Sequence, residues 1–432
     1  MGIFIAILTF FLILFLVRLF VNDHGFRRIS WLVISVWYFP LFFMLVAPFK
    51  TVFDLNSFVV FISISIVFLI IFFPILIFRG RIKSSALYAR EVYLNEQRSS
   101  IVLLLAACSF LFILVDIFYY RGVTLSLDLH GNRELYDGDS PLSHLVMLFL
   151  PFSYIALVYA VRGFSLKSFL YFLPYVACSL VYLVSGNRQY FIFGFIILMC
   201  CMFFLSGQSF IRRLAIAITV VSFVVVSMLF VQFSRQSYAE GQQAEFIYSI
   251  SNISCEGDVC EKAVVVPLVY LYQYFGVEYL GLSAIYDLKV NYGVDALPLS
   301  QTLPVLYRRL EGLLNLPPQM EEHLRLHSEF NDVFGVFPRF WKTMYSGVLQ
   351  EYGPLGFLWL GLFFFLTHIM MIYSFLKRPS SLSFAFLMAF YSSIIFGVMF
   401  FPLFEPVIFI LSVYGFLYSL ANSFFGKLKL GN

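Results

Sequence analysis

The first candidate for chemistry is an arginine in a very short connection between two apolar segments. In Ser185-Gly186-Asn187-Arg188-Gln189, the Gly-Asn pair favours a tight turn that leaves Arg188 little room to reach solvent. The planar guanidinium of Arg188 can grip a phosphate or a carboxylate with two parallel hydrogen bonds. The alternative is that Arg188 extends toward lipid headgroups as a membrane anchor.

A second candidate site lies at the end of a long polar segment, just before the next apolar run. It combines histidines, acids and bases: His323, Arg325, His327, Glu329, Asp332, Arg339 and Lys342. His327 or Glu329 could act as a general base near neutral pH, while Arg325 and Arg339 could neutralise a pyrophosphate. A solvated charged face is the alternative interpretation. His323 and His327 have the i, i+4 spacing of a helical metal pair, but they lack a third ligand, so we predict no metal site.

Asp116 precedes Arg121 by five residues near the end of an apolar run. We interpret these two residues as an ion pair or a helix cap rather than a catalytic pair. Motifs for other chemistries are missing: the sequence has no Walker A loop, no HExxH motif, no Cys/His zinc set and no GxSxG elbow. We therefore expect neither ATP nor any other cofactor.

The elements that must position these residues are membrane-spanning helices. Of 432 residues, 61% are hydrophobic and 12% are charged, and the mean hydropathy is +0.90. A soluble domain of this size needs a more charged surface, and no basic surface suited to nucleic acid is apparent. The sequence predicts an all-α, polytopic helical bundle with about eleven spans, near 2–21, 29–49, 57–78, 101–120, 143–161, 168–186, 189–206, 213–233, 347–376, 382–401 and 406–424.

The spans divide the chain into three parts. Residues 1–233 hold the first eight helices, 234–346 form one large loop, and 347–432 hold the last three helices. Alternate connections are rich in Lys and Arg, which predicts a periplasmic N-terminus and a cytoplasmic C-terminus by the positive-inside rule. The large loop then lies outside. Within it, we interpret the apolar, tyrosine-rich stretch 264–286 as interfacial or re-entrant helices, because a full crossing would reverse the charge bias.

Two cysteines fall in that outer loop. Cys255 and Cys260 flank Glu-Gly-Asp-Val, and a disulfide between them suits the oxidising bacterial periplasm. Two free thiols are the alternative. The other cysteines lie within predicted spans, where a thiol behaves as a small apolar group.

The chain resembles bacterial oligosaccharide repeat unit polymerases, the Wzy-type O-antigen polymerases, and more distantly the O-antigen ligases. Gly186-Asn187-Arg188 is similar to their Gly-x-Arg turn between two middle spans. A threonine followed by an acidic-aromatic-Gly-x-x-Gly pattern, Thr343 and then Glu351-Tyr352-Gly353-Pro354-Leu355-Gly356, is similar to their entry into the span after the large loop.

The resemblance implies a GT-C-like bundle in the bacterial inner membrane that catalyses inverting, metal-independent glycosyl transfer at the periplasmic face. A growing polysaccharide would move from undecaprenyl pyrophosphate onto a lipid-linked repeat unit, with membrane lipids and a chain-length regulator as further partners. The hypothesis assigns the pyrophosphate and glycan to Arg188, Arg325, Arg339, Thr343 and Glu351, and assigns His327 or Glu329 as the base.

The sequence also departs from the family pattern. Nine residues separate Arg325 from Gly335, where the family's paired Arg-Gly loops are described with ten. His327-Ser328-Glu329 stands where a ligase has His-Asn, which favours a polymerase. An O-antigen ligase and a flippase for lipid-linked oligosaccharides remain the alternatives; a transporter would show repeated halves and more polar residues within its spans.

Overall fold

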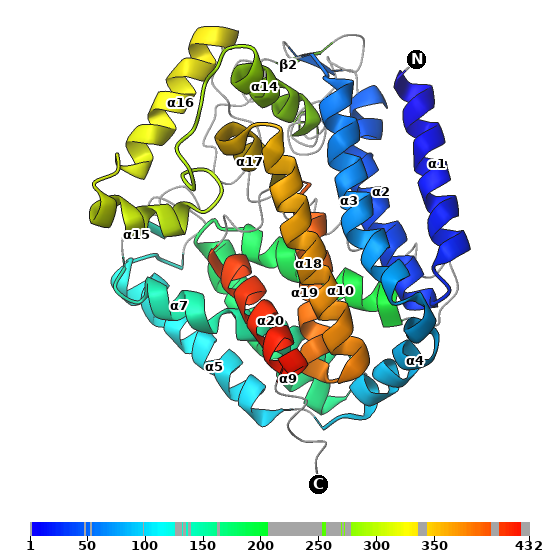
Figure 1. Cartoon of the computed structure of the whole chain (residues 1–432). Coiled ribbons are helices and arrows are strands. Elements are labelled where there is room, and N and C mark those ends of the chain that lie inside the picture. Colours follow the sequence, from blue (N-terminus) through cyan, green and yellow to red (C-terminus); the bar gives the residue numbers. More distant parts are fainter. Residues whose placement is uncertain are drawn as a thin grey trace.

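The computed structural model describes residues 2–46, 49–51, 54–97, 99–125, 132, 135–136, 140–161, 165–205, 253–255, 269, 272, 278–335, 344–398 and 406–424. Most of these residues are helical, and two short strands and several turns and loops make up the rest (Figure 1). The elements are α1 (Gly2–Phe20), α2 (His24–Val46), β1 (Phe49–Thr51), α3 (Ser57–Ile77), α4 (Arg79–Asn95), α5 (Ser100–Leu114), the π-helix η1 (Val115–Tyr120), α7 (Ser143–Phe149), α8 (Pro151–Ala160), α9 (Leu166–Val184), α10 (Gln189–Leu205), β2 (Ile253–Cys255), α14 (Glu278–Val290), α15 (Pro304–Leu314), α16 (Gln319–Phe334), α17 (Met344–Tyr352), α18 (Leu355–Lys377), α19 (Ser381–Phe396) and α20 (Pro406–Phe424).

Five helices are long and apolar enough to cross a membrane: Ser57–Ile77, Ser100–Tyr120, Ser143–Ala160, Leu166–Val184 and Leu355–Lys377. Several of them present large apolar side chains to the outside, such as Phe61, Leu104, Leu173 and Trp359. An apolar exterior this extensive needs lipid as its solvent. The chain is therefore a helical, multi-pass membrane protein. Shorter apolar helices occupy other predicted spans, so the count of about eleven stays a prediction, and 213–233 lies outside the described residues.

One end of the bundle carries α4 (Figure 1). Arg90 of α4 forms an ion pair with Asp23, which precedes α2. The hydroxyl of Tyr93 donates to the carbonyl of Val158, 2.6 Å away, and so joins α4 to α8. Glu96 accepts hydrogen bonds from the backbone N–H and the hydroxyl of Ser381 at the start of α19. Helix α4, which we predicted only as a basic loop, thus holds three helices together.

The opposite end is covered by a layer of helices α14 to α17, and α1 begins at this same end (Figure 1). Strands β1 and β2 pair antiparallel here, with Phe49 opposite Cys255. Helix α14 packs on the bundle: the hydroxyl of Tyr279 donates to the carbonyl of Trp37 at 2.8 Å, and Ser283 accepts from the N–H of Asn56 at 3.0 Å. We refer to α14–α17 as the outer layer.

Two tyrosines of 264–286 are packed inside the protein. Tyr279 is 1% exposed and Tyr272 is 2% exposed, and the interfacial or re-entrant placement of this stretch stays a prediction. Tyr272 packs on Phe49 and Phe43. The helix that begins in this stretch, α14, is largely buried, and the hydroxyls of Tyr279 and Ser283 find partners inside the protein.

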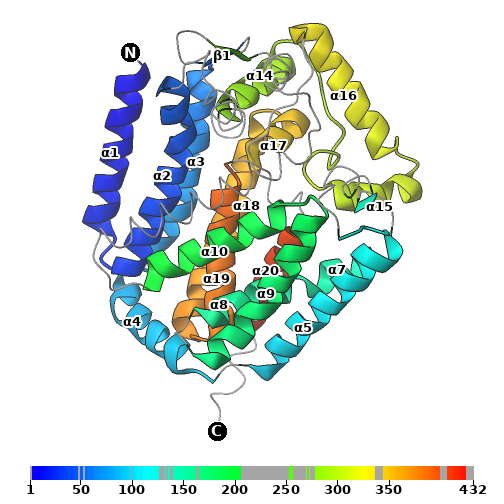
Figure 2. The same ribbon diagram turned by 180° about the vertical axis from the view of Figure 1, so that it is seen from behind.

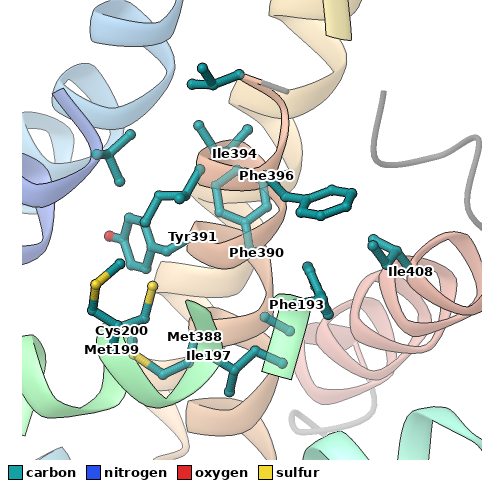
Figure 3. Close-up of a cluster of buried hydrophobic side chains, with 14 of the residues drawn as sticks. Phe193, Ile197, Met199, Cys200, Met388, Phe390, Tyr391, Ile394, Phe396 and Ile408 are labelled. Atoms are coloured by element: carbon teal, nitrogen blue, oxygen red, sulfur yellow. The ribbon is translucent and has the colours of Figure 1, made fainter. Parts of the chain in front are cut away.

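The bundle core lies where α10, α19 and α20 meet. Figure 2 shows α10 crossing α18 and α19 at a steep angle, and Figure 3 shows the side chains that fill the crossing. Phe193 meets Phe396 edge to face, with ring centroids 5.7 Å apart, and the hydroxyl of Ser392 donates to the Cys200 sulfur at 3.4 Å. Gly194 leaves room for the ring of Tyr175, which a Cβ atom at that position would overlap. Aromatic, aliphatic and sulfur-containing side chains thus pack together at this crossing.

We predicted one continuous span over 347–376, and this prediction is wrong because the segment forms two helices. The chain turns between α17 and α18, where Gly353 has φ +62° and Pro354 follows. At Gly356, a Cβ atom would overlap the backbone carbonyl of Val348. The glycines of the Glu-Tyr-Gly-x-x-Gly pattern thus have structural causes: one permits a left-handed turn, and the other lets α18 approach α17.

Replacing Gly356 by Ala should destabilise the protein by about 1–3 kcal/mol, because α17 and α18 must move apart. Gly80→Ala is the matched control: no atom lies within 4 Å of its added Cβ, and Ala favours helix by up to about 1 kcal/mol. Thermal unfolding in detergent measures both changes. Equal melting temperatures for the two variants would contradict the close approach.

Candidate functional site

The turn between α9 and α10 holds Arg188 rigidly at the start of α10. Gly186 has φ +72°, and the N–H of Asn187 donates to the carbonyl of Tyr182 at 2.8 Å. The side-chain oxygen of Asn187 accepts from the N–H of Gln189 at 3.1 Å, which fixes the beginning of α10. Arg188 itself is only 7% exposed. The turn therefore keeps the guanidinium within the protein, as the short connection predicted, rather than extended into the lipid headgroups.

A polar cluster from an earlier part of the chain supports this turn. Asn132 donates to the carbonyl of Val184 at 3.1 Å, and the side-chain N–H of Asn187 donates to the Tyr136 hydroxyl at 3.3 Å. Arg121 lies over the Tyr136 ring, 4.9 Å from its centroid, and forms an ion pair with Asp116 at 2.8 Å. The interpretation of Asp116 and Arg121 as an ion pair is confirmed. Asp116 lies in the π-helix η1, a geometry that occurs often near functional sites.

The charged cluster on α16 forms an internal network. Arg325 donates to both oxygens of Glu322 at 2.9 Å, to Glu329 Oε1 at 2.7 Å and to the carbonyl of Asp295 at 2.6 Å. The hydrogen bond to Glu322 is the largest cause that raises the pKa of Arg325, and Glu329 adds to it against the opposing effect of burial. Arg325 therefore holds α16 to the segment after α14, and its predicted contact with pyrophosphate stays a prediction.

Two candidate bases sit on the same helix. Glu329 Oε2 is buried and has no hydrogen-bond partner among the described residues, whereas its other oxygen accepts from Arg325. The rings of His323 and His327 lie 4.1 Å apart. In the part of the chain that the structure describes, no group of three His, Cys, Asp or Glu residues is placed to hold a metal ion. The lone pairs of Glu329 Oε2 are thus not used by the described residues.

Glu351 is a buried carboxylate that ties α17 to the loop before α15. Its Oε1 accepts from the N–H groups of Gln301 and Thr302 at 2.6 and 2.8 Å, and its Oε2 accepts from the Thr302 hydroxyl at 2.7 Å. Burial raises the pKa of Glu351, while these hydrogen bonds oppose that rise. These contacts give Glu351 a structural role in the outer layer, and its predicted contact with glycan or pyrophosphate stays a prediction.

An apolar groove of about 570 Å³ lies between α18, α19 and α20. Helices α18 and α20 run side by side in Figure 1. One end of the groove meets the outer layer at Leu299, Thr302 and Tyr352, and Met371 lines its wall along α18. The volume is within the range of about 300–1,000 Å³ that is typical of small-molecule sites.

The structure brings some predicted site residues together and separates others. Arg325 and Glu329 share one face of α16, and His327, two residues from each, lies on another face. Helix α16 lies at the outer rim of the molecule, whereas α9 and α10 belong to the bundle (Figures 1 and 2). Cys255 is disulfide-bonded. The remaining predicted residues lie outside the described part of the chain: Arg339, Thr343 and Cys260.

Sequence reasoning missed two buried polar groups. His368 lies in the middle of α18 and is fully buried; its Nδ1 is 2.8 Å from the carbonyl of Ile70, and its Nε2 is 2.9 Å from the Tyr391 hydroxyl. A lone histidine in an apolar run was the available signal. Gln350 is 3% exposed, and its side-chain oxygen has no partner among the described residues. His368 connects three helices, whereas Gln350 offers a hydrogen-bond acceptor beside Glu351.

No protein-family model, curated protein or solved structure matches this chain.

Replacing Glu351 by Ala should lower stability by about 2–4 kcal/mol, because two buried N–H groups and one hydroxyl lose their acceptor. Glu351→Gln keeps an acceptor oxygen and should cost less than about 1 kcal/mol. Thermal unfolding in detergent at neutral pH separates the two variants.

The pH dependence gives a further check on Glu351. The folded carboxyl has a raised pKa, so the folded state binds this proton more tightly than the unfolded chain does. The carboxyl's contribution to stability is then fully present below the unfolded pKa and decreases as pH rises through the folded pKa. Glu351→Gln should remove this pH-dependent contribution to stability. A wild-type melting temperature with the same pH profile as Glu351→Gln would contradict the raised pKa.

Proposed function

We propose that this protein is an O-antigen polymerase, an inverting glycosyltransferase that extends a lipid-linked polysaccharide at the periplasmic face of the bacterial inner membrane. The observation that carries the proposal is the buried Arg188, held at the rigid turn between α9 and α10. A fixed, partly desolvated guanidinium is suited to a pyrophosphate, whose charge grows as it departs. The resemblance of the turn and of the Glu-Tyr-Gly-x-x-Gly pattern supplies the reaction class.

In the proposed reaction, a hydroxyl of the acceptor repeat unit attacks the anomeric carbon of the donor chain. The new C–O bond forms as the bond between that carbon and the pyrophosphate oxygen breaks, and undecaprenyl pyrophosphate leaves with the electron pair. A base takes the hydroxyl proton, and positive charge stabilises the leaving group. This displacement inverts the anomeric centre and requires neither a nucleotide nor a metal.

The residues divide as follows in this proposal. Arg188 binds the pyrophosphate, together with Arg339 from the segment outside the described residues. Glu329 is the preferred base over His327, because Glu329 Oε2 is a buried acceptor without a partner among the described residues. Arg325 holds Glu329 in place. A base on α16 can act in the reaction of a donor that is bound at Arg188 only if α16 lies closer to α9 and α10. In this proposal, binding of the glycan brings these helices together.

The proposed orientation in the membrane follows from the positions of the basic residues. Basic residues such as Arg79, Arg90 and Lys377 gather at the end with α4, which we assign to the cytoplasm, and the outer layer lies at the other end. This assignment places the N-terminus in the periplasm and includes about eleven spans. The partners are then the lipid-linked donor and acceptor, membrane lipids and a chain-length regulator.

Arg188→Ala should reduce polymer formation by about 10²–10³-fold, the usual loss when one charge-stabilising donor is removed. The measurement is a lipopolysaccharide gel of the source bacterium with this gene deleted and then complemented by wild type or variant. Deletion should leave core carrying a single repeat unit, and wild type but not Arg188→Ala should restore the ladder.

Arg308→Ala is the matched control, because Arg308 is exposed on α15 and donates to Gln319 at 3.0 Å. It should restore the ladder. Core without any repeat unit would indicate a ligase or a flippase instead, and a normal ladder from Arg188→Ala would refute the role of this residue.

A further inference from the structure

The groove between α18, α19 and α20 opens toward lipid rather than toward water. Trp359 and Phe363 line it on α18 and are 67% and 46% exposed. Both lie on Leu355–Lys377, one of the helices able to cross a membrane. A hydrocarbon chain can therefore enter sideways from the bilayer without crossing a polar layer.

The few polar groups of the groove wall are already satisfied within the protein. The hydroxyl of Thr367 donates to the carbonyl of Phe363 at 2.8 Å, and that of Ser393 donates to the carbonyl of Ala389 at 2.9 Å. Ser412 donates to the carbonyl of Ile408 at 2.8 Å. The hydroxyls of the wall thus donate their hydrogens to backbone carbonyls of their own helices. This leaves an apolar surface for a ligand. A sugar or a phosphate placed there would lose hydrogen bonds to water, whereas a hydrocarbon loses none.

The outer end of the groove differs from the wall. There the groove meets Thr302, whose hydroxyl donates to Glu351, and Tyr352 on α17. Lys289 lies beside them, with its ammonium 3.3 Å from the carbonyl of Glu351. A chain lying in the groove would therefore carry its polar head into the outer layer, on the side of the membrane where the proposed reaction occurs.

The lining also favours one kind of hydrocarbon. Rigid aromatic rings from all three helices face the groove, among them Phe364, Phe390 and Phe416. The planar double bonds and methyl branches of an isoprenoid present flat, polarisable units to such rings, while a saturated acyl chain gains no comparable specificity.

We propose that this groove binds the isoprenoid chain of the lipid-linked substrate, with the polar head of that lipid at residues 299–303 and α17. The inference rests on the proposed function for the identity of the lipid, and it assigns a site separate from Arg188. The chain fixes the donor laterally, so that binding energy from a remote part of the substrate can orient the reacting end.

The test is photolabelling of the full-length protein in nanodiscs of phosphatidylethanolamine and phosphatidylglycerol. The probe is a polyprenyl phosphate with a diazirine in its chain, and mass spectrometry locates the labelled peptides. Label should appear on α18, α19 and α20. Ser412→Trp should reduce it about tenfold, because the indole fills volume that the chain needs.

Leu358→Trp is the matched control, since Leu358 is 64% exposed on α18 but does not line the groove. It should label like wild type. If Ser412→Trp fails to fold, Ala389→Leu repeats the test with less added volume. Undiminished labelling in a folded groove variant would overturn the proposal. A phosphatidylethanolamine that carries the same diazirine and labels the groove equally, without displacement by excess polyprenyl phosphate, would also overturn it.

The outcomes for the groove and for the proposed function are distinguishable. Arg188→Ala should keep groove labelling while losing the polysaccharide ladder. Polymer formation by a wild-type protein whose groove takes no label would reject the groove and leave the polymerase. If the groove is labelled but the polysaccharide ladder survives deletion of the gene, the proposed polymerase function is rejected and the groove proposal is not.

Discussion

A hydrocarbon layer offers no hydrogen-bond partners, and the rest of this structure follows from that constraint. The chain meets this constraint in two ways. Its helices pair the N–H and C=O groups of their own backbone, and its polar side chains pair inside the protein. His368 bridges the carbonyl of Ile70 and the hydroxyl of Tyr391, and Asp116 pairs with Arg121. Charges otherwise gather at two ends of the bundle. One end is held by α4, and the other is covered by the outer layer.

One carboxylate links two parts of the outer layer. Glu351 binds two backbone N–H groups and the hydroxyl of Thr302, so it joins α17 to the loop that precedes α15. That loop contributes Leu299 and Leu303 to the outer end of the apolar groove. The turn at Gly353 then directs α18 down into the bundle. The same few residues therefore shape the mouth of the groove and connect the outer layer to the membrane.

Local patterns predicted the helices well and their partners poorly. Apolar runs located α3, α5, α9 and α18, because about twenty apolar residues have few other uses. The apolar run alone did not separate α17 from α18, whereas Gly353 followed by Pro354 is a local signal for a helix end that the prediction did not use. The role of Glu351 was hidden because its partners Gln301 and Thr302 lie about fifty residues earlier. A tight turn at Arg188 was predictable because glycine and asparagine determine it locally.

The most direct test of this account is the sidedness of the two ends, measured with a membrane-impermeant maleimide on intact cells. Ser328→Cys marks the outer layer on α16, and Gly80→Cys marks α4; both positions are exposed. The wild type gives the background, because its described cysteines are buried, half-buried or, for Cys255, disulfide-bonded. The account predicts that Ser328→Cys reacts in intact cells and that Gly80→Cys reacts only after permeabilisation. Equal reaction of both variants in intact cells would contradict it.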